Sequence, residues 1–109
     1  MDKVFSIIVP TYNRPSELIS CLISLENQKF RNFEVIVIDD CSTTISDMSY
    51  QFNYQLTYYK LKVNLGAAGA RNFGSKLAKG KWLVFLDDDD VFESEKLEVL
   101  YDVIKENIK

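Results

Sequence analysis

The sequence contains no histidine and only two cysteines among its 109 residues. Without histidine the chain has no imidazole base to activate a nucleophile, and a zinc site is not expected. Cys21 and Cys41 form no spacing motif. We therefore expect reduced thiols in a cytoplasmic protein and no disulfide framework.

Clusters of positive charge and long apolar runs are also missing. The 13 Lys and Arg residues are scattered among 16 Asp and Glu residues, and the net charge is -3, so nucleic acid is not an expected partner. No apolar run approaches the roughly 20 residues of a transmembrane segment. The first apolar stretch ends at Pro10 without a small-residue cleavage site, so we expect no signal peptide.

The hydrophobic pattern predicts alternating strands and helices in one small domain. Apolar strands are expected at 4–9, 33–38, 56–61 and 82–86, with the third near a sheet edge. Helices are expected from Pro15 to about 25, weakly over 45–52, after Gly69 to about 78 with Gly80 as C-cap, and over 95–108. Strands that are apolar on both faces indicate an α/β fold, a Rossmann-like parallel sheet of about four strands with flanking helices.

Polar residues collect where the predicted strands end. Thr11 and Tyr12 follow the first strand, Asp39–Asp40 the second, and Asp87–Asp90 the fourth. The carboxyl ends of parallel strands share one edge of the sheet, where ligands of open α/β sheets bind. If the fourth strand lies beside the first, with the second on the other side, these groups converge on one crevice.

The Asp87–Asp90 run places four like charges side by side. A divalent cation would relieve their repulsion, and several oxygen ligands suit magnesium, manganese or calcium, with substrate phosphates completing the shell. A solvated turn, or an acidic start to the next helix, explains the run equally well.

The segment from Gly66 to Gly74 is rich in glycine and alanine but matches neither a Walker loop nor a dinucleotide fingerprint. Its small residues allow close approach of the backbone to a ligand or a neighbouring strand. Arg71 in this segment either faces a carboxylate or phosphate, or lies on the surface.

Together, five separated blocks resemble the nucleotide-sugar-binding half of the family 2 glycosyltransferases, which have the GT-A fold. The blocks are Pro-Thr-Tyr-Asn, Gln-x-Phe-x-x-Phe-Glu, Asp-Asp-x-Ser, Asn-x-Gly-x-x-x-Ala-Arg-Asn-x-Gly and Gly-x-Trp-Leu-x-Phe-Leu-Asp-x-Asp-Asp, in that order. The resemblance runs from about Ser6 through Asp90 into the last predicted helix, which is nearly the whole chain.

The resemblance implies roles for matching residues. Tyr12 would lie against the nucleotide base, Asp40 would accept a hydrogen bond from it, and Asp87–Asp89 would correspond to the family's Asp-x-Asp motif. The residues implied to contact the nucleotide are Pro10, Thr11, Tyr12, Asn13, Asp40, Arg71, Asp87 and Asp88. Asp89 is implied to bind Mn²⁺ or Mg²⁺.

The implied activity is metal-dependent transfer of a sugar from a nucleotide diphosphate donor, with a UDP-sugar expected, to a carbohydrate or lipid-linked acceptor, with inversion. The resemblance supplies no catalytic base within the sequence. We therefore interpret residues 1–109 as the donor-binding part of a truncated GT-A domain that lacks the acceptor half and is inactive alone. An exposed sheet edge would then favour a homodimer, and the full-length protein is expected in the cytoplasm or at the inner membrane surface.

Two other functions fit parts of the pattern. A noncatalytic nucleotide-binding or assembly module of the same fold would keep the site and lose the chemistry. A receiver-type signalling domain is suggested by Val-Ile-Val-Ile-Asp-Asp at 35–40. In receiver domains, however, the acidic pair follows the first strand and a separate Asp the third, whereas here they follow the second and fourth predicted strands.

Overall fold

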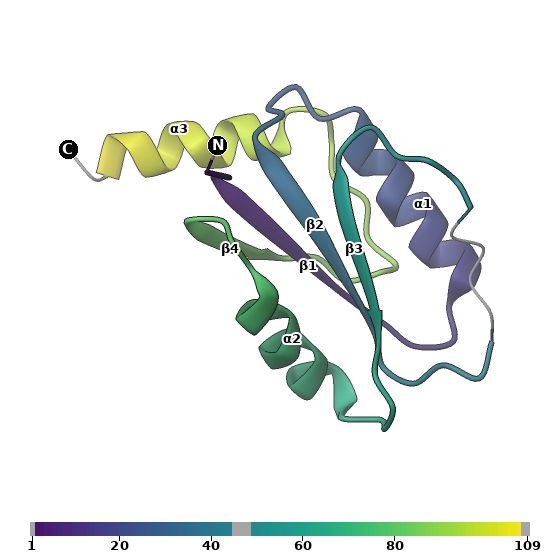
Figure 1. Ribbon diagram of the computed structural model, residues 1–109. Coiled ribbons are helices and arrows are strands. Elements are labelled where there is room, and N and C mark those ends of the chain that lie inside the picture. Colours follow the sequence, from purple (N-terminus) through teal and green to yellow (C-terminus); the bar gives the residue numbers. More distant parts are fainter. Residues whose placement is uncertain (1, 45–48, 108–109) are drawn as a thin grey trace.

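Four parallel strands form the centre of the computed structural model, which describes residues 2–44 and 49–107. The strands are β1 (Phe5–Thr11), β2 (Phe33–Asp39), β3 (Gln55–Lys60) and β4 (Trp82–Phe85). Their order across the sheet is β3-β2-β1-β4, so β1 pairs with both β2 and β4 (Figure 1). The expected α/β fold and the conditional strand order are both confirmed.

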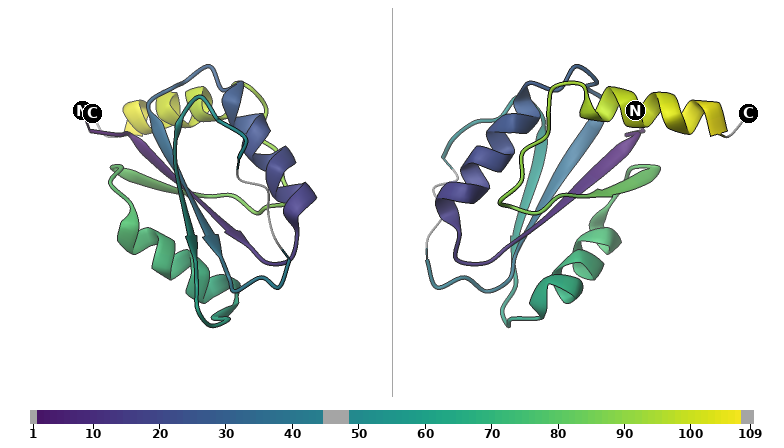
Figure 2. Two further views of the ribbon diagram at one scale, coloured as in Figure 1. Left: turned by 45° about the vertical axis from the view of Figure 1, so that its right-hand side comes forward. Right: turned by 180° about the vertical axis from the view of Figure 1, so that it is seen from behind.

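In the described part of the chain, three helices flank this sheet: α1 (Pro15–Glu26), α2 (Gly66–Leu77) and α3 (Lys96–Asn107). The helices α1 and α2 cover opposite faces, and α3 crosses the end of the sheet at which β1 begins (Figure 2). None of the helices within residues 2–44 and 49–107 is long and apolar enough to cross a bilayer.

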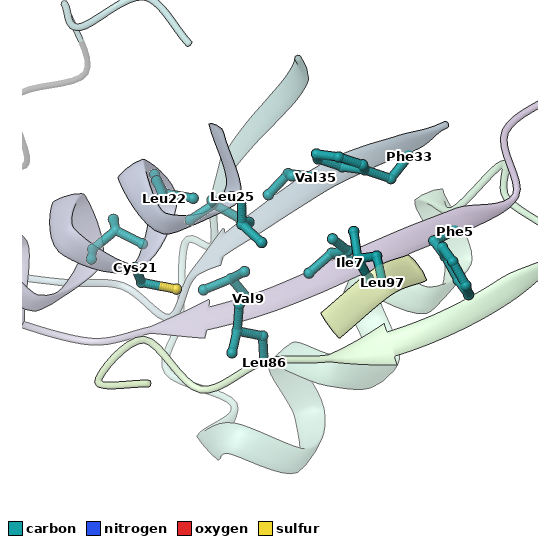
Figure 3. Close-up of a cluster of buried hydrophobic side chains, with 12 residues drawn as sticks. Phe5, Ile7, Val9, Cys21, Leu22, Leu25, Phe33, Val35, Leu86 and Leu97 are labelled. Carbon is teal, nitrogen blue, oxygen red and sulfur yellow. The ribbon is translucent and has the colours of Figure 1, made fainter. Parts of the chain in front are cut away.

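Alternation along β1 and β2 supplies a core on each face of the sheet. Ile7, Val9 and Val35 point toward Leu22 and Leu25 of α1 in the larger core, which also receives Leu97 of α3 (Figure 3). The alternate residues of both strands point to the other face of the sheet. There Ile8, Ile36 and Ile38 form a smaller core with Leu61 and with Ala70 of α2. Helices cover both faces of β1 and β2, which explains why the sequences of these two strands are nearly continuous apolar runs.

The strand β4 is less buried than its composition predicts. Trp82, Leu83 and Phe85 expose 40%, 44% and 49% of their surface. In the part of the chain that the structure describes, β4 pairs with β1 alone, so it is an edge strand with one open side. The apolar run therefore indicated a strand correctly but not its burial.

Two helix predictions also need correction. The expected helix over 45–52 falls partly on residues 45–48, which lie outside the described residues, and residues 49–52 are not helical. The second long helix starts at Gly66, so Gly69 lies inside it, and its C-cap is Ala78 in an extended conformation. Gly80 is therefore not a helix cap.

Gly80 instead lets the α2–β4 turn lie against the start of β1. A Cβ atom at Gly80 would lie 2.7 Å from the carbonyl carbon of Phe5 and from the amide nitrogen of Ser6. The Gly80 amide donates to Ser6 Oγ at 2.7 Å, and the Ser6 hydroxyl donates to the buried Glu34 carboxylate at 2.6 Å. Glu34 also accepts from the Lys79 amide at 2.7 Å. This network ties the turn before β4 to Ser6 of β1 and Glu34 of β2.

We expect Gly80→Ala to lower the free energy of unfolding by about 2 kcal/mol, because the methyl group would overlap backbone atoms that cannot rotate away. Urea unfolding followed by circular dichroism measures this loss. Lys79→Ala is the matched control, since it places an alanine at an exposed position in the same turn. It also keeps the backbone amide that donates a hydrogen bond to Glu34. Equal stability of the two variants would contradict the close approach at Gly80.

Candidate functional site

A cavity of about 330 Å³, open to solvent, lies between the carboxyl ends of β1, β2 and β4 and the helix α2. Most of the residues implied by the sequence line it. The lining residues are Pro10, Thr11, Tyr12, Arg14, Asp40, Ala67, Ala70, Arg71, Asp87, Asp88 and Asp89. The predicted convergence on one crevice is therefore present in the structure, with Asn13 outside this lining set.

Asn13 joins two loops of the site. Its backbone has a positive φ of 54°, a conformation that asparagine tolerates better than most residues. The side-chain oxygen of Asn13 accepts from the backbone amides of Thr43 at 2.8 Å and Thr44 at 3.2 Å, and the Asn13 amide donates to Ser42 Oγ at 2.9 Å. Asn13 thus fixes the loop after β1 to the loop after β2.

Tyr12 presents an open aromatic ring to the cavity. Its side chain follows β1 directly, and 46% of the residue's surface is exposed. Pro10 and Ala67 line the same cavity. A flat, accessible aromatic ring beside a polar crevice is suited to stacking with a nucleobase.

Asp40 has a structural role in addition to facing the cavity. Its two carboxylate oxygens accept from the backbone amides of Leu65 at 2.7 Å and Gly66 at 2.9 Å. These amides lie at the start of α2, so the Asp40 carboxylate caps that helix from another element. Only 4% of Asp40 is exposed. Its neighbour Asp39 accepts from the Ser42 amide and the Tyr58 hydroxyl.

Asp88 points inward and meets the end of β1. The Thr11 hydroxyl donates to Asp88 Oδ2 at 2.8 Å, and the residue is buried. Burial raises the pKa of the Asp88 carboxyl above its usual value, although the hydrogen bond from Thr11 and the charge of Arg14 oppose that shift. The Thr11–Asp88 contact therefore joins the end of β1 to the segment after β4, and both residues line the cavity.

The rest of the acidic run turns toward solvent. The Asp90 amide donates to the Asp87 carbonyl oxygen at 3.0 Å, which closes a turn. Carboxylate oxygens of Asp87, Asp89 and Asp90 lie within 4.8 Å of one another. Three hard oxygen donors at this spacing fit a divalent cation such as Mg²⁺ or Mn²⁺. The run is not the start of the next helix, because α3 begins at Lys96.

Two arginines flank the acidic turn. Arg71 Nη2 lies 3.1 Å from Asp87 Oδ1, and Arg14 Nη1 lies 3.1 Å from Asp89 Oδ2. The sequence had singled out Arg71, whose helix approaches the sheet closely at Gly74, where a Cβ atom would lie 2.6 Å from Ile8 Cγ2. The resemblance assigned no role to Arg14 or to Asp90, although Asp90 belongs to the acidic run for which the sequence suggested a cation. The position of Arg14 immediately before Pro15, in the loop after β1, was the available signal for the arginine.

The sequence matches one protein-family model over residues 6–109, and that model is described as glycosyl transferase family 2. An uncharacterized glycosyltransferase of Haemophilus influenzae is 45% identical over 104 residues, which cover 95% of this chain and 35% of that protein. The chain thus spans about a third of the length of this relative.

Solved structures agree with the sequence match. S. aureus TarS, residues 1–349, superposes with a TM-score of 0.84 at 37% identity. The match covers 94% of this chain and 32% of that 1–349 chain, and a complex of the same protein contains UDP-GlcNAc. The mannosyltransferase PcManGT from Pyrobaculum calidifontis, solved with GDP-Man and Mn²⁺, superposes with a TM-score of 0.74 at 23% identity, over 89% of this chain and 31% of that protein. The second likeness supports the fold alone.

The raised pKa of Asp88 predicts a pH-dependent loss of stability. In the pH range above about 4, up to the raised pKa of Asp88, the folded chain binds more protons than the unfolded chain. The contribution of this group to stability therefore falls as the pH rises. We expect the stability of the wild type, relative to Asp88→Asn, to be greater at pH 4 than at pH 7.

Urea unfolding of both proteins at the two pH values measures this difference. Asp102→Asn, at an exposed position on α3, is the control for removing one carboxylate. A pH-independent difference between the wild type and Asp88→Asn would contradict the burial effect.

Proposed function

The chain belongs to glycosyl transferase family 2, and we propose that residues 1–109 form the donor-binding part of an enzyme that transfers a sugar from a nucleotide diphosphate to an acceptor hydroxyl. The observation that carries this proposal is the single cavity that Tyr12, Asp40 and Asp89 line together. The aromatic ring is suited to stacking with a base, and the buried carboxylate can accept a hydrogen bond from the edge of that base. The acidic turn is suited to holding a metal ion that also binds the diphosphate.

In this proposal the nucleotide base lies on Tyr12 and donates a hydrogen bond to Asp40. Both Asp40 oxygens already accept hydrogen bonds from backbone amides, but each carboxylate oxygen can accept more than one hydrogen bond. Capping therefore leaves Asp40 able to bind a base. The UDP-GlcNAc complex of TarS, a relative at 37% identity, supports a UDP-sugar as the donor.

The diphosphate would lie beside Asp87, Asp89 and Arg71. The carboxylates of Asp87, Asp89 and Asp90 would hold Mn²⁺ or Mg²⁺, with phosphate oxygens completing the coordination shell. Such an ion supplies stabilisation of the negative charge that develops on the leaving nucleoside diphosphate. The presence of Mn²⁺ with GDP-Man in PcManGT is consistent with this choice of ion in the same fold.

The acceptor site and the catalytic base belong, in this proposal, to the part of the relatives that this chain does not cover. We propose that the transfer inverts the anomeric centre, that the acceptor is a carbohydrate or a lipid-linked sugar, and that the 109-residue chain alone binds nucleotide without transferring sugar. The open edge of β4 would favour a homodimer of this chain. A noncatalytic nucleotide-binding module is the alternative, and sugar transfer by a longer gene product would exclude it.

Asp89→Ala is expected to abolish Mn²⁺-dependent binding of UDP, because it removes one of the three clustered carboxylates. Isothermal calorimetry with and without Mn²⁺ measures the dependence. Asp102→Ala, which removes an exposed carboxylate on α3, is expected to bind like the wild type. Unchanged UDP affinity of Asp89→Ala would remove Asp89 from the metal site.

Tyr12→Ala is expected to weaken binding of uridine by about 1 kcal/mol or more, the magnitude associated with stacking of a base on an aromatic side chain. Uridine carries no phosphate, so this measurement isolates the base from the metal. Tyr12→Phe keeps the ring and is expected to retain the affinity. If uridine binds Tyr12→Ala as tightly as the wild type, the base does not stack on this residue.

A further inference from the structure

The guanidinium of Arg14 occupies a carboxylate oxygen of the acidic turn that a divalent ion would need as a ligand. Its Nη1 atom donates to Asp89 Oδ2 at 3.1 Å and lies 3.8 Å from Asp88 Oδ1. A Mg²⁺ or Mn²⁺ ion binds carboxylate oxygens at about 2.1 Å. An ion on Asp89 would therefore lie close to the guanidinium, and two cations at that separation repel each other.

The backbone that carries Arg14 is held in place. Pro15 occupies the first turn of α1 and disfavours a helical backbone at the residue before it, and Arg14, with φ of -135° and ψ of 61°, is not helical. The Arg14 carbonyl oxygen accepts from the Leu18 amide at 2.9 Å. Asn13, the preceding residue, is bound to the loop after β2. Only the long side chain can move away from Asp89, and half of its surface is exposed.

Arg14 also lines the cavity proposed for the nucleotide. A side chain displaced from Asp89 therefore remains next to the space where the diphosphate would lie. A guanidinium binds phosphate oxygens through charge-assisted hydrogen bonds, so the displaced group would exchange a carboxylate partner for a phosphate partner.

We propose that Arg14 is an internal counter-cation that lowers the affinity of the acidic turn for a free divalent ion and raises its affinity for an ion that arrives with a nucleotide diphosphate. This inference rests on the proposed function, because it takes the metal and the diphosphate from it. Arg14 makes the site select the metal–nucleotide pair over the metal alone. In the absence of nucleotide it neutralises part of the acidic turn.

The test is a pair of binding measurements on Arg14→Gln. Mn²⁺ alone is titrated and followed by electron paramagnetic resonance, and UDP is titrated by calorimetry at saturating Mn²⁺. We expect Arg14→Gln to bind Mn²⁺ alone about fivefold more tightly than the wild type, and UDP with Mn²⁺ about fivefold more weakly. A merely structural role would weaken both kinds of binding together.

Two further variants complete the design. Lys29→Gln removes one positive charge from an exposed pair with Glu95 and reports the effect of net charge alone. Its affinities for Mn²⁺ and for UDP are expected to stay within about twofold of the wild type. Arg14→Lys keeps the charge without the planar fork of donors, and its affinities are expected between those of the wild type and Arg14→Gln.

The outcomes separate this inference from the proposed function. If the wild type binds Mn²⁺ with UDP but Arg14→Gln does not bind Mn²⁺ alone more tightly than Lys29→Gln, the counter-cation role is wrong and the metal site stands. The same holds if UDP affinity is unchanged in Arg14→Gln. If the wild type binds no Mn²⁺ with or without UDP, both proposals are wrong.

Discussion

The parallel pairing of β1 with β2 on one side and β4 on the other is the constraint on which the site depends. It brings three strand ends to one edge, although they are separated by about 30 to 80 residues in sequence. The pairing continues past the strands: the Asp40 amide donates to the Thr11 carbonyl oxygen at 2.8 Å, and the Leu86 amide donates to Ile8 at 3.0 Å. The Thr11–Asp88 hydrogen bond completes this arrangement with side chains. Tyr12, Asp40 and the acidic turn are therefore held by backbone register.

Charge at this edge is concentrated and only partly neutralised. Among the described residues, the guanidinium of Arg14 lies close to Asp88 and Asp89, and that of Arg71 lies close to Asp87. The negative charge of the acidic run also affects the buried thiol of Cys21. Burial raises its pKa to about 12, and the acidic run contributes to the rise in that pKa. Under the proposed function, a region that disfavours further negative charge also receives a diphosphate, and this electrostatic conflict is the physical basis for proposing a metal ion there.

The sequence predicted the part of the site that depends on strand ends, because the positions of Thr11, Tyr12, Asp40 and Asp87 follow from where apolar runs stop. It did not predict which carboxylates within the acidic run turn toward each other. That depends on the turn closed between Asp87 and Asp90, which sends Asp88 inward and groups Asp90 with the others. The burial of β4 was also predicted wrongly, since an apolar run indicates a strand without indicating how many neighbours the strand has.

The double role of Asp40 links the part of the cavity where we propose that the base binds to the part proposed for the diphosphate. Its carboxylate caps the start of α2, and α2 carries Arg71, which pairs with Asp87 after β4. A base that donates to Asp40 would share oxygens that already accept the first amides of that helix. Any loss of nucleotide affinity on replacing Asp40 therefore combines two effects. One is the lost contact with the base, and the other is the lost cap of α2, the helix that positions Arg71. The geometry makes the two ends of the site one connected unit, and β1 lies between them.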